Sequence, residues 1–421
     1  MSLPESDEFD KKLQADPLRH KGFTDQLQLD IEQAVDRKEK SRNRLKPYLI
    51  IGGFTAAIAT ALLFPWSSLT LHKSIPTAAI EADAPLSEQT FVISSPPPVS
   101  TAVLIGLRTE HKVTDASRKL STTEYSTYRT MLFAPVKGEL RKTSEGSGIL
   151  MPYKQSFWKI DSLVHRTATE EIHYLSPHLA EQPAKPFIFA NESTKPMQQV
   201  ETLVFAGNEY VSIVDSKKVL QDNTPVQSEK AWVRTLPQLK EKSTFQLTAA
   251  DSNKSYTTLT DLYGDNIRGV LNTLSGKRQI TGMPSEISNR NWLVSRSPGE
   301  WVAKALETYM LPGIKSEEYI THDFPRALPD NVSNHDKICC SWSDIQTYWP
   351  NAKDALTSPM NDLIVVFEND TLQFYPYGQV PNATSMLSVD LKPGEQLVMA
   401  QWATDHYVQE WITKVDKLLQ E

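Results

Sequence analysis

A mostly apolar stretch without charged side chains runs from Pro47 to Leu71, and Tyr48 carries its only ionisable group. The dense part, from Tyr48 to Phe64, would span roughly 25 Å as a helix that rises about 1.5 Å per residue. That length is close to the hydrocarbon thickness of a bilayer, and Tyr48 and Trp66 lie where aromatic residues gather at membrane interfaces. A buried helix of a soluble domain is the alternative, but few such helices are apolar on every side. The pattern predicts one transmembrane helix over residues 47–66.

Basic residues gather before this stretch and are scarce after it. The ten residues before the stretch contain one acidic residue, Glu39, and six basic ones, Arg37, Lys38, Lys40, Arg42, Arg44 and Lys46. Since positively charged flanks stay in the cytoplasm, we expect residues 1–46 inside the cell and the C-terminal part outside it. A cleaved signal peptide is the alternative, but the nearest small-residue site, Ala82 to Ala84, is followed by Pro85, which disfavours cleavage. The pattern favours a retained signal-anchor in the cell membrane.

Small residues recur along one face of this predicted helix. Gly53, Ala57 and Ala61 are spaced four residues apart, as are Gly52 and Ala56. Such a face permits close helix contact in lipid and therefore a homodimer through the transmembrane helix. The alternative is that glycine and alanine are simply common in membrane helices.

Two polar segments flank the anchor. In the tail, Thr24 is a candidate N-cap for a short amphipathic helix whose apolar stripe comprises Leu27, Ile31, Ala34 and Val35. Such a helix lies along the membrane, binds a partner, or continues the anchor as a solvated extension. Residues 67–100 contain Pro76, Pro85 and Pro96–Pro98 without periodicity, which is typical of an extended tether. The outer domain is then expected over residues 101–421.

Within 101–421 an apolar run, a short polar turn and an aromatic-led run recur. The pattern occurs at 148–164, 201–214, 291–307 and 361–377, and Gly207-Asn208 is a two-residue turn signal in the second copy. It predicts a mainly β (α+β) domain built from antiparallel hairpins. The turn aromatics are unevenly spaced, so the pattern fits either a degenerate β-propeller or a large twisted β-sandwich.

Three stretches with helical periodicity interrupt or follow the predicted strands. Apolar residues from Leu259 to Leu274 repeat at helical spacing and stop at Gly276, and Trp342 to Trp349 precedes Pro350. The chain closes with an amphipathic stretch from about Thr404, which carries Trp411 and Val415 on its apolar face. We expect helical inserts and a C-terminal helix that packs on the domain's own sheet.

Composition narrows the functional classes. The 421 residues are 39% apolar and 23% charged, as in ordinary folded proteins, and the net charge of −7 gives no basic footprint for nucleic acid. The only two cysteines, Cys339 and Cys340, are adjacent. They are either packing residues or a strained and redox-labile vicinal disulfide.

No motif in the sequence assigns a catalytic, cofactor-binding or metal-ligating residue. Ser275-Gly276-Lys277 lacks the rest of a phosphate loop, and Glu145-Gly146-Ser147-Gly148 has the wrong spacing for a nucleophile elbow. HExxH, CxxC and the EF-hand loop are also absent from the sequence. We therefore expect a protein that is not an enzyme and that needs no cofactor, and its ligand-binding residues stay unassigned.

Two clusters of ionisable residues are nevertheless candidates for chemistry. The first comprises His165, Glu170, Glu171 and His173, and if its flanks form a hairpin the two histidines would approach closely enough to share a metal with a glutamate. The alternative is that the histidines are single residues on a strand rim. A weaker cluster comprises His322, Asp323, His335 and Asp336.

Aromatic residues are candidates for a sugar- or peptide-binding face, because their rings offer a flat apolar surface with a polar handle. The residues in question are Trp158, Tyr210, Trp292, Trp301 and Tyr375. Core packing is the competing interpretation for each of them.

The arrangement of tail, anchor and outer domain resembles that of bacterial single-pass transmembrane regulators of the anti-sigma-factor kind. The tail FDKKLQADPLRHKGFTDQLQLDIEQ, the inward-anchored helix and the outer domain carry this resemblance, and GILMPYKQSFWKIDSL is similar to segments of bacterial envelope ectodomains. It implies an envelope regulator. The chain lacks the His and Cys pattern of the zinc-containing anti-sigma class, so no functional residue is transferred.

A large outer domain joined to a tail too small to fold alone suggests a membrane-anchored envelope protein. We expect the outer domain to bind an envelope ligand or protein partner, and the tail to receive the signal. The alternatives are an anchored extracytoplasmic hydrolase, which predicts a pocket with paired carboxylates or a histidine with a carboxylate, and a non-catalytic scaffold of an envelope or sporulation complex.

Overall fold

The computed structural model of this chain describes residues 98–189, 192–240, 256–277, 284–311, 316–377 and 384–420. The predicted cytoplasmic tail (1–46), the transmembrane helix (47–66) and all but the last residues of the tether (67–100) lie outside the described residues. Within these ranges no helix has both the length and the apolar character needed to cross a bilayer. The architecture below is that of the C-terminal part.

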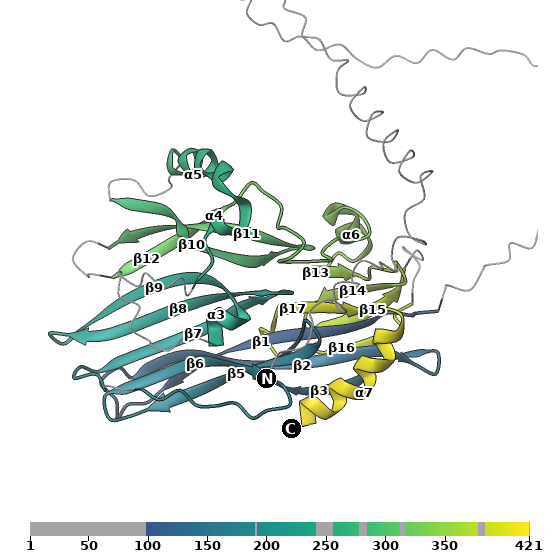
Figure 1. The fold of residues 1–421 in the computed structure, drawn as a ribbon, viewed down its shortest axis with the longest axis horizontal. Helices are drawn as coiled ribbons and strands as arrows, with labels where there is room; N and C mark the ends of the chain where they lie inside the picture. The colour runs from purple at the N-terminus through teal and green to yellow at the C-terminus, as the bar shows by residue number, and fades with distance from the viewer. Residues whose placement is uncertain are drawn as a thin grey trace, which may run out of the picture. The chain divides into compact units, whose positions relative to one another are not determined.

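The described strands form three sheets (Figure 1). Sheet A contains, in spatial order, β17 (Gln396–Ala403), β1 (Ala102–Thr114), β2 (Thr122–Val136) and β3 (Glu139–Ser147). Sheet B contains, in spatial order, β10 (Ser285–Ser297), β11 (Glu300–Met310), β12 (Glu317–Asp323), β9 (Thr224–Thr235), β8 (Tyr210–Gln221), β7 (Met197–Ala206), β6 (Glu170–Leu179), β5 (Ser156–Arg166) and β4 (Ile149–Tyr153). Sheet C contains β13 (Ala352–Thr357), β14 (Leu363–Glu368), β15 (Thr371–Pro376) and β16 (Leu387–Asp390). Strands make up 55% of the described residues and helices 15%, which confirms a mainly β domain.

All four predicted hairpins are present, as β4–β5, β7–β8, β10–β11 and β14–β15. The turn of β7–β8 differs from the prediction, because the Gly207 N–H donates to the Tyr210 carbonyl at 2.9 Å and leaves Asn208 and Glu209 at the tip. Gly207 is required for another reason. A Cβ atom there would lie 2.1 Å from the Val332 carbonyl oxygen, so the glycine permits a close approach of two backbones.

The hairpins extend into consecutive three-stranded meanders, β4-β5-β6, β7-β8-β9 and β10-β11-β12. Short parallel pairings join them, between Glu170–His173 of β6 and Met197–Val200 of β7, and between Glu317 of β12 and Ser228 of β9. Through these pairings the three meanders merge into one nine-stranded sheet, and the described strands do not close into a barrel.

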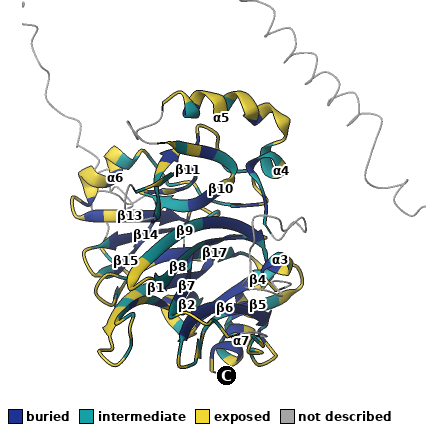
Figure 2. Cartoon of the chain, turned by 90° about the vertical axis from the view of Figure 1, so that its left-hand side faces the viewer, coloured by how far each residue is buried: buried dark blue, intermediate teal, exposed yellow. Residues whose placement is uncertain are grey.

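The central part of sheet A is buried on both faces. Leu104 and Leu132 pack on one side with Leu203 of sheet B. On the other side, Phe133 packs against Phe374 of sheet C, with ring centroids 4.5 Å apart. Each fully buried side chain of this kind contributes about 1.5–3 kcal/mol. Figure 2 shows the resulting burial along the strand interiors.

The helices lie around these sheets as α3 (Leu236–Lys240), α4 (Leu259–Tyr263), the 3-10 turn η1 (Asp265–Ile267), α5 (Arg268–Ser275), α6 (Trp342–Tyr348) and α7 (His406–Gln420). The predicted helix over 259–274 is interrupted at Gly264, which has a φ of 76°. The predicted C-terminal helix is confirmed as α7. Its apolar face packs into the core shared by sheets A and B through Val408, Trp411, Val415, Leu418 and Leu419.

The two adjacent cysteines are free thiols in this structure. Cys339 and Cys340 are half-buried against the cluster formed by α6 and sheet C, and their Sγ atoms lie 2.9 Å apart. Burial, together with the hydrogen bond to Cys339, raises the pKa of the Cys340 thiol to about 12. The arrangement agrees with the packing interpretation.

Candidate ligand-binding cavity

Strand β1 projects beyond its neighbour β17. The pairing of these strands stops at Arg108 and Gln396, whereas β1 stays paired with β2 as far as Thr114. Next to this projecting part lies a cavity of about 560 Å³, here called the polar cavity. Its size falls within the roughly 300–1,000 Å³ that is typical of ligand sites.

The walls of the polar cavity come from six strands of two sheets. Sheet A contributes Arg108, Glu110, His111 and Lys112 from β1 and Thr123, Glu124, Tyr125 and Ser126 from β2. Sheet B contributes Gln198, Val200, Thr202, Val204, Val214, Ser216, Lys218, Gln227, Glu229 and Tyr319 from β7, β8, β9 and β12. Alternate residues on β7 and β8 face the cavity, as the two-residue period of a strand requires.

Arg108 is the most deeply buried charge in this wall, with 7% of the residue exposed. Its Nη2 donates to Glu110 Oε1 at 2.8 Å and to Gln396 Oε1 at 2.5 Å. Its Nε has no hydrogen-bond partner but is itself buried from solvent. A guanidinium keeps its charge and offers five donors, so an arginine in the lining of a cavity is suited to donate a hydrogen bond to an oxygen atom of a ligand.

Tyr319 and Glu229 face Arg108 from sheet B. Burial raises the pKa of Tyr319, the negative charge of Glu229 adds to this effect, and the positive charge of Arg108 opposes it. Gln227 Nε2 donates to Glu229 Oε1 at 3.1 Å. The floor of the cavity therefore combines a cationic donor, a phenol, an amide and a carboxylate.

The first predicted cluster lies on the β5–β6 hairpin that the sequence analysis assumed. Its two histidines do not meet, because His165 pairs with Ile172 and His173 with Val164, and successive residues of a strand point to opposite faces. His165 lies 3.9 Å from Glu170, whereas His173 lies 3.0 Å from Glu171. Across the described ranges no three His, Cys, Asp or Glu residues are arranged to hold a metal ion. The shared metal site is therefore not formed in the described residues.

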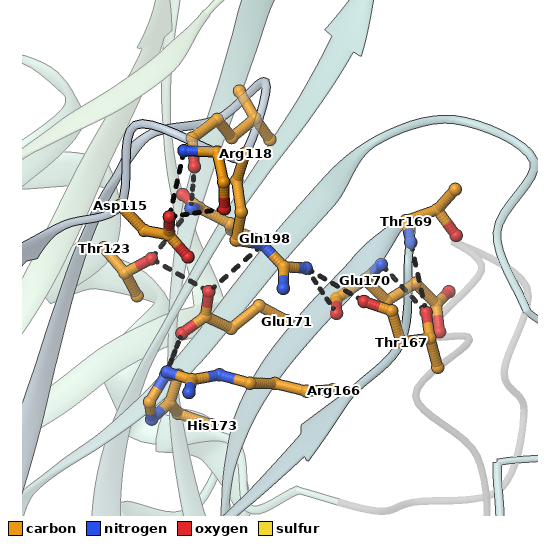
Figure 3. Close-up of polar contacts among 12 residues, drawn as sticks. Asp115, Arg118, Thr123, Arg166, Thr167, Thr169, Glu170, Glu171, His173 and Gln198 are labelled. Carbon is orange, nitrogen blue, oxygen red and sulfur yellow. Dashed lines mark hydrogen bonds and ion pairs between the residues drawn. The ribbon is translucent and has the colours of Figure 1, made fainter.

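Glu171 instead centres a polar network behind the cavity wall (Figure 3). Its carboxylate receives Arg166 Nη2 at 2.8 Å and lies 3.6 Å from Arg118 Nε. Burial acts to raise the pKa of Glu171, but hydrogen bonds from His173 and Arg166 outweigh it and hold the pKa below its usual value. Thr123 Oγ1, which itself lines the cavity, donates to the same carboxylate at 3.3 Å. The network supports the cavity wall rather than facing a ligand.

Three rings stack from this network out to the cavity. His173 lies 4.7 Å from Tyr125 and Tyr125 lies 5.1 Å from His111, measured between ring centroids. Burial lowers the pKa of His173, against the effect of Glu171. Stacking of these rings holds Tyr125 and His111 in place, and these two residues belong to the part of the cavity lining that β1 and β2 contribute.

The second predicted cluster is dispersed in the structure. His322 bonds to Glu307 at 2.7 Å, Asp323 to Lys304 at 2.7 Å, and His335 to the Thr357 carbonyl at 2.9 Å. Asp336 pairs with Arg296 at 2.7 Å. Each residue has a separate structural partner, so these residues do not form a shared site.

The predicted aromatic face is also not formed. Trp292, Trp301 and Tyr375 are buried in the cores, which confirms the packing interpretation for them. Trp158 and Tyr210 are partly buried and pack against two different core clusters. None of the five lines the polar cavity.

A second cavity of about 420 Å³ adjoins the first. Arg108 and Val204 line both, so the two cavities adjoin at these residues. Two acids of the second cavity are already paired, since Asp354 receives Arg296 and Glu395 receives Arg129. Exposed Lys353 and Lys392 lie at its rim.

The sequence contains one signal for Arg108. In AVLIGLRTEHKVT, the apolar residues of β1 fill both faces up to Leu107, and charged residues begin at Arg108. This change marks the point where the strand leaves the core. The pattern does not show that Arg108 is buried, because the covering residues come from distant strands.

The comparisons with known proteins bring no family assignment. No protein-family model matches this chain, and no curated protein is similar to it in sequence.

Proposed function

We propose that this protein is a single-pass, membrane-anchored binding protein of the bacterial cell envelope, whose outer domain holds a polar ligand or partner in the polar cavity. The observation that carries the proposal is Arg108, a nearly buried positive charge in the lining of the polar cavity. A guanidinium offers five donors, so Arg108 can donate a further hydrogen bond to a ligand oxygen while it stays bonded to Glu110 and Gln396.

Membrane anchoring is supported by the apolar stretch 47–66 and the basic residues before it. We further propose that occupancy of the cavity is reported to the tail over residues 1–46. Deleting residues 1–40 should then abolish the response of regulated genes while leaving ligand binding intact. An unchanged response in this deletion would remove the signalling part of the proposal.

Photocrosslinking in native membranes tests the binding part. In the full-length protein, p-benzoylphenylalanine replaces Lys112, which lines the cavity, has 67% of its side chain exposed, and forms one ion pair with Glu124. The matched control is Arg141 on β3, with 58% of its side chain exposed and one ion pair with Glu139. We expect an adduct at position 112 and none at 141. No adduct at 112, or equal adducts at both positions, would contradict a ligand site.

The same experiment separates the alternatives. A hydrolase would convert the captured molecule, so a product without its parent would favour that class. A scaffold would give protein adducts that do not depend on Arg108. The proposed binding protein should give an adduct with the intact ligand, and the yield of this adduct should depend on Arg108.

A further inference from the structure

We infer that the ligand is an uncharged oligosaccharide chain that lies across Arg108, with one part in the polar cavity and the next in the second cavity. This inference rests on the proposed function and names the ligand class of the same site.

The charges of the polar cavity argue against an ion as ligand. Three basic side chains, Arg108, Lys112 and Lys218, face three acidic ones, Glu110, Glu124 and Glu229. Four of these six charges already form two ion pairs, Arg108 with Glu110 at 2.8 Å and Lys112 with Glu124 at 2.7 Å. An anion would meet the carboxylate of Glu229, and a cation would meet the ammonium group of Lys218. A neutral ligand avoids both repulsions.

The polar groups instead suit a molecule with many hydroxyls. Arg108 offers donors, Glu229 offers acceptors, and Tyr319, Thr202 and Ser216 each offer both. A sugar hydroxyl also donates one hydrogen bond and accepts others. Adjacent sugar hydroxyls can therefore be satisfied by this mixed set, which a ligand made only of acceptors or only of donors would leave partly unpaired.

The cavity also contains an apolar strip that fits the C–H faces of sugar rings. Val200 and Val204 on β7 and Val214 on β8 line it, and Tyr319 lines it from β12, which is separated from β8 by β9. Val214 and Tyr319 pack against the same core cluster. Flat apolar surface beside a polar handle is what an aromatic residue offers to such a face.

The two cavities indicate a chain rather than a single sugar. The linings of the two cavities have only Arg108 and Val204 in common. A ligand chain that extends from one cavity into the other would contact these two residues. The buried acids of the second cavity are neutralised by Arg296 and Arg129. Its rim again carries mixed groups, Lys353, Asp370 and Lys392. The second cavity therefore also offers both hydrogen-bond donors and acceptors.

The test applies full-length protein in nanodiscs to an array of neutral and acidic bacterial oligosaccharides of graded length, with a peptide array in parallel. We expect binding to neutral chains that strengthens from disaccharides to longer oligomers. Arg108→Met should weaken it at least about tenfold, Arg108→Lys less, and Arg141→Met not at all. Thermal unfolding by circular dichroism confirms that each variant is folded.

The outcomes are distinguishable from those of the proposed function. Preference for acidic glycans, for peptides, or for no array member would overturn the oligosaccharide inference. If an Arg108-dependent adduct still forms at position 112 in membranes, the binding function stands with another ligand class. Equal binding of disaccharides and longer chains would overturn the extension into the second cavity.

Discussion

The carboxylate of Asp362 holds Thr101 by two hydrogen bonds, from the backbone N–H at 3.0 Å and from the hydroxyl at 2.7 Å. The same carboxylate receives the N–H and hydroxyl of Ser100 at 2.6 and 2.8 Å and the hydroxyl of Ser358 at 2.6 Å. Asp362 lies between β13 and β14, and Thr101 directly precedes β1. This cluster therefore fixes the chain where it enters the central sheet, next to the strand that carries Arg108.

Removing the carboxylate should destabilise the outer domain. Asp362→Ala leaves several buried donors without an acceptor, and we expect a loss of about 2–4 kcal/mol in the free energy of unfolding. Urea unfolding of the full-length protein followed by tryptophan fluorescence measures it. The control is Asp370→Ala, an exposed acid for which we expect little change. Equal effects of both substitutions would contradict the role given to Asp362.

The contribution of Asp362 should also depend on pH. Burial acts to raise its pKa, but the hydrogen bonds from Ser358, Thr101 and Ser100 lower it below the ordinary 3.8. A carboxyl whose pKa is depressed in the folded state stabilises fully above its unfolded pKa and loses this contribution as the pH falls through the folded pKa. The difference in unfolding free energy between the natural protein and Asp362→Asn should therefore be constant near neutral pH and shrink below about pH 4. A difference that grows on acidification would have the wrong sign.

Much of the fold was predictable because it depends on local patterns. The hairpins β4–β5 and β14–β15 follow from apolar strands joined by polar turns, and the apolar face of α7 follows from its helical period. The merging of meanders into sheet B was not predictable, because the joining pair of Glu317 and Ser228 is far apart in sequence.

The candidate site was harder to predict for the same reason. His165 and His173 were correctly placed on one hairpin, but only the strand register shows that they point to opposite faces. Arg108 belongs to a charged run that resembles a solvated strand, and its burial depends on Gln396 and Tyr319 from distant strands. Trp292 and Trp301 were candidates for a binding face, with core packing as the competing interpretation, and the structure buries both rings in the core.

Docking of α7 on sheet A should be sensitive to Gly146. A Cβ atom at this position would lie 2.4 Å from the Leu419 carbonyl oxygen, so Gly146→Ala forces the helix to shift. We expect a loss of about 1–3 kcal/mol in the free energy of unfolding. The control is Gly269→Ala in α5, where no atom lies within 4 Å and helix propensity predicts a gain of up to about 1 kcal/mol. Because the clash involves backbone, truncating Leu419 to alanine should not rescue Gly146→Ala, and a rescue would contradict this account.

The predicted membrane topology can be measured with fusions. Alkaline phosphatase is active only outside the cytoplasm. It should be active when fused after residue 421 and inactive when inserted after residue 40 of the full-length chain, which keeps the anchor. Replacing the basic residues of 37–46 with neutral ones should reduce this asymmetry. Phosphatase activity of the insertion at residue 40 would place the tail outside the cytoplasm and contradict the proposed orientation.

The most direct test of the central claim is the yield of the photocrosslinked adduct at position 112 in membranes from cells that carry different residues at position 108. If Arg108 holds the ligand, the yield should fall at least about tenfold in Arg108→Met, fall less in Arg108→Lys, and stay unchanged in Arg141→Met. An equal yield in Arg108→Met and in the natural protein would contradict the claim that this buried arginine holds a ligand in the polar cavity.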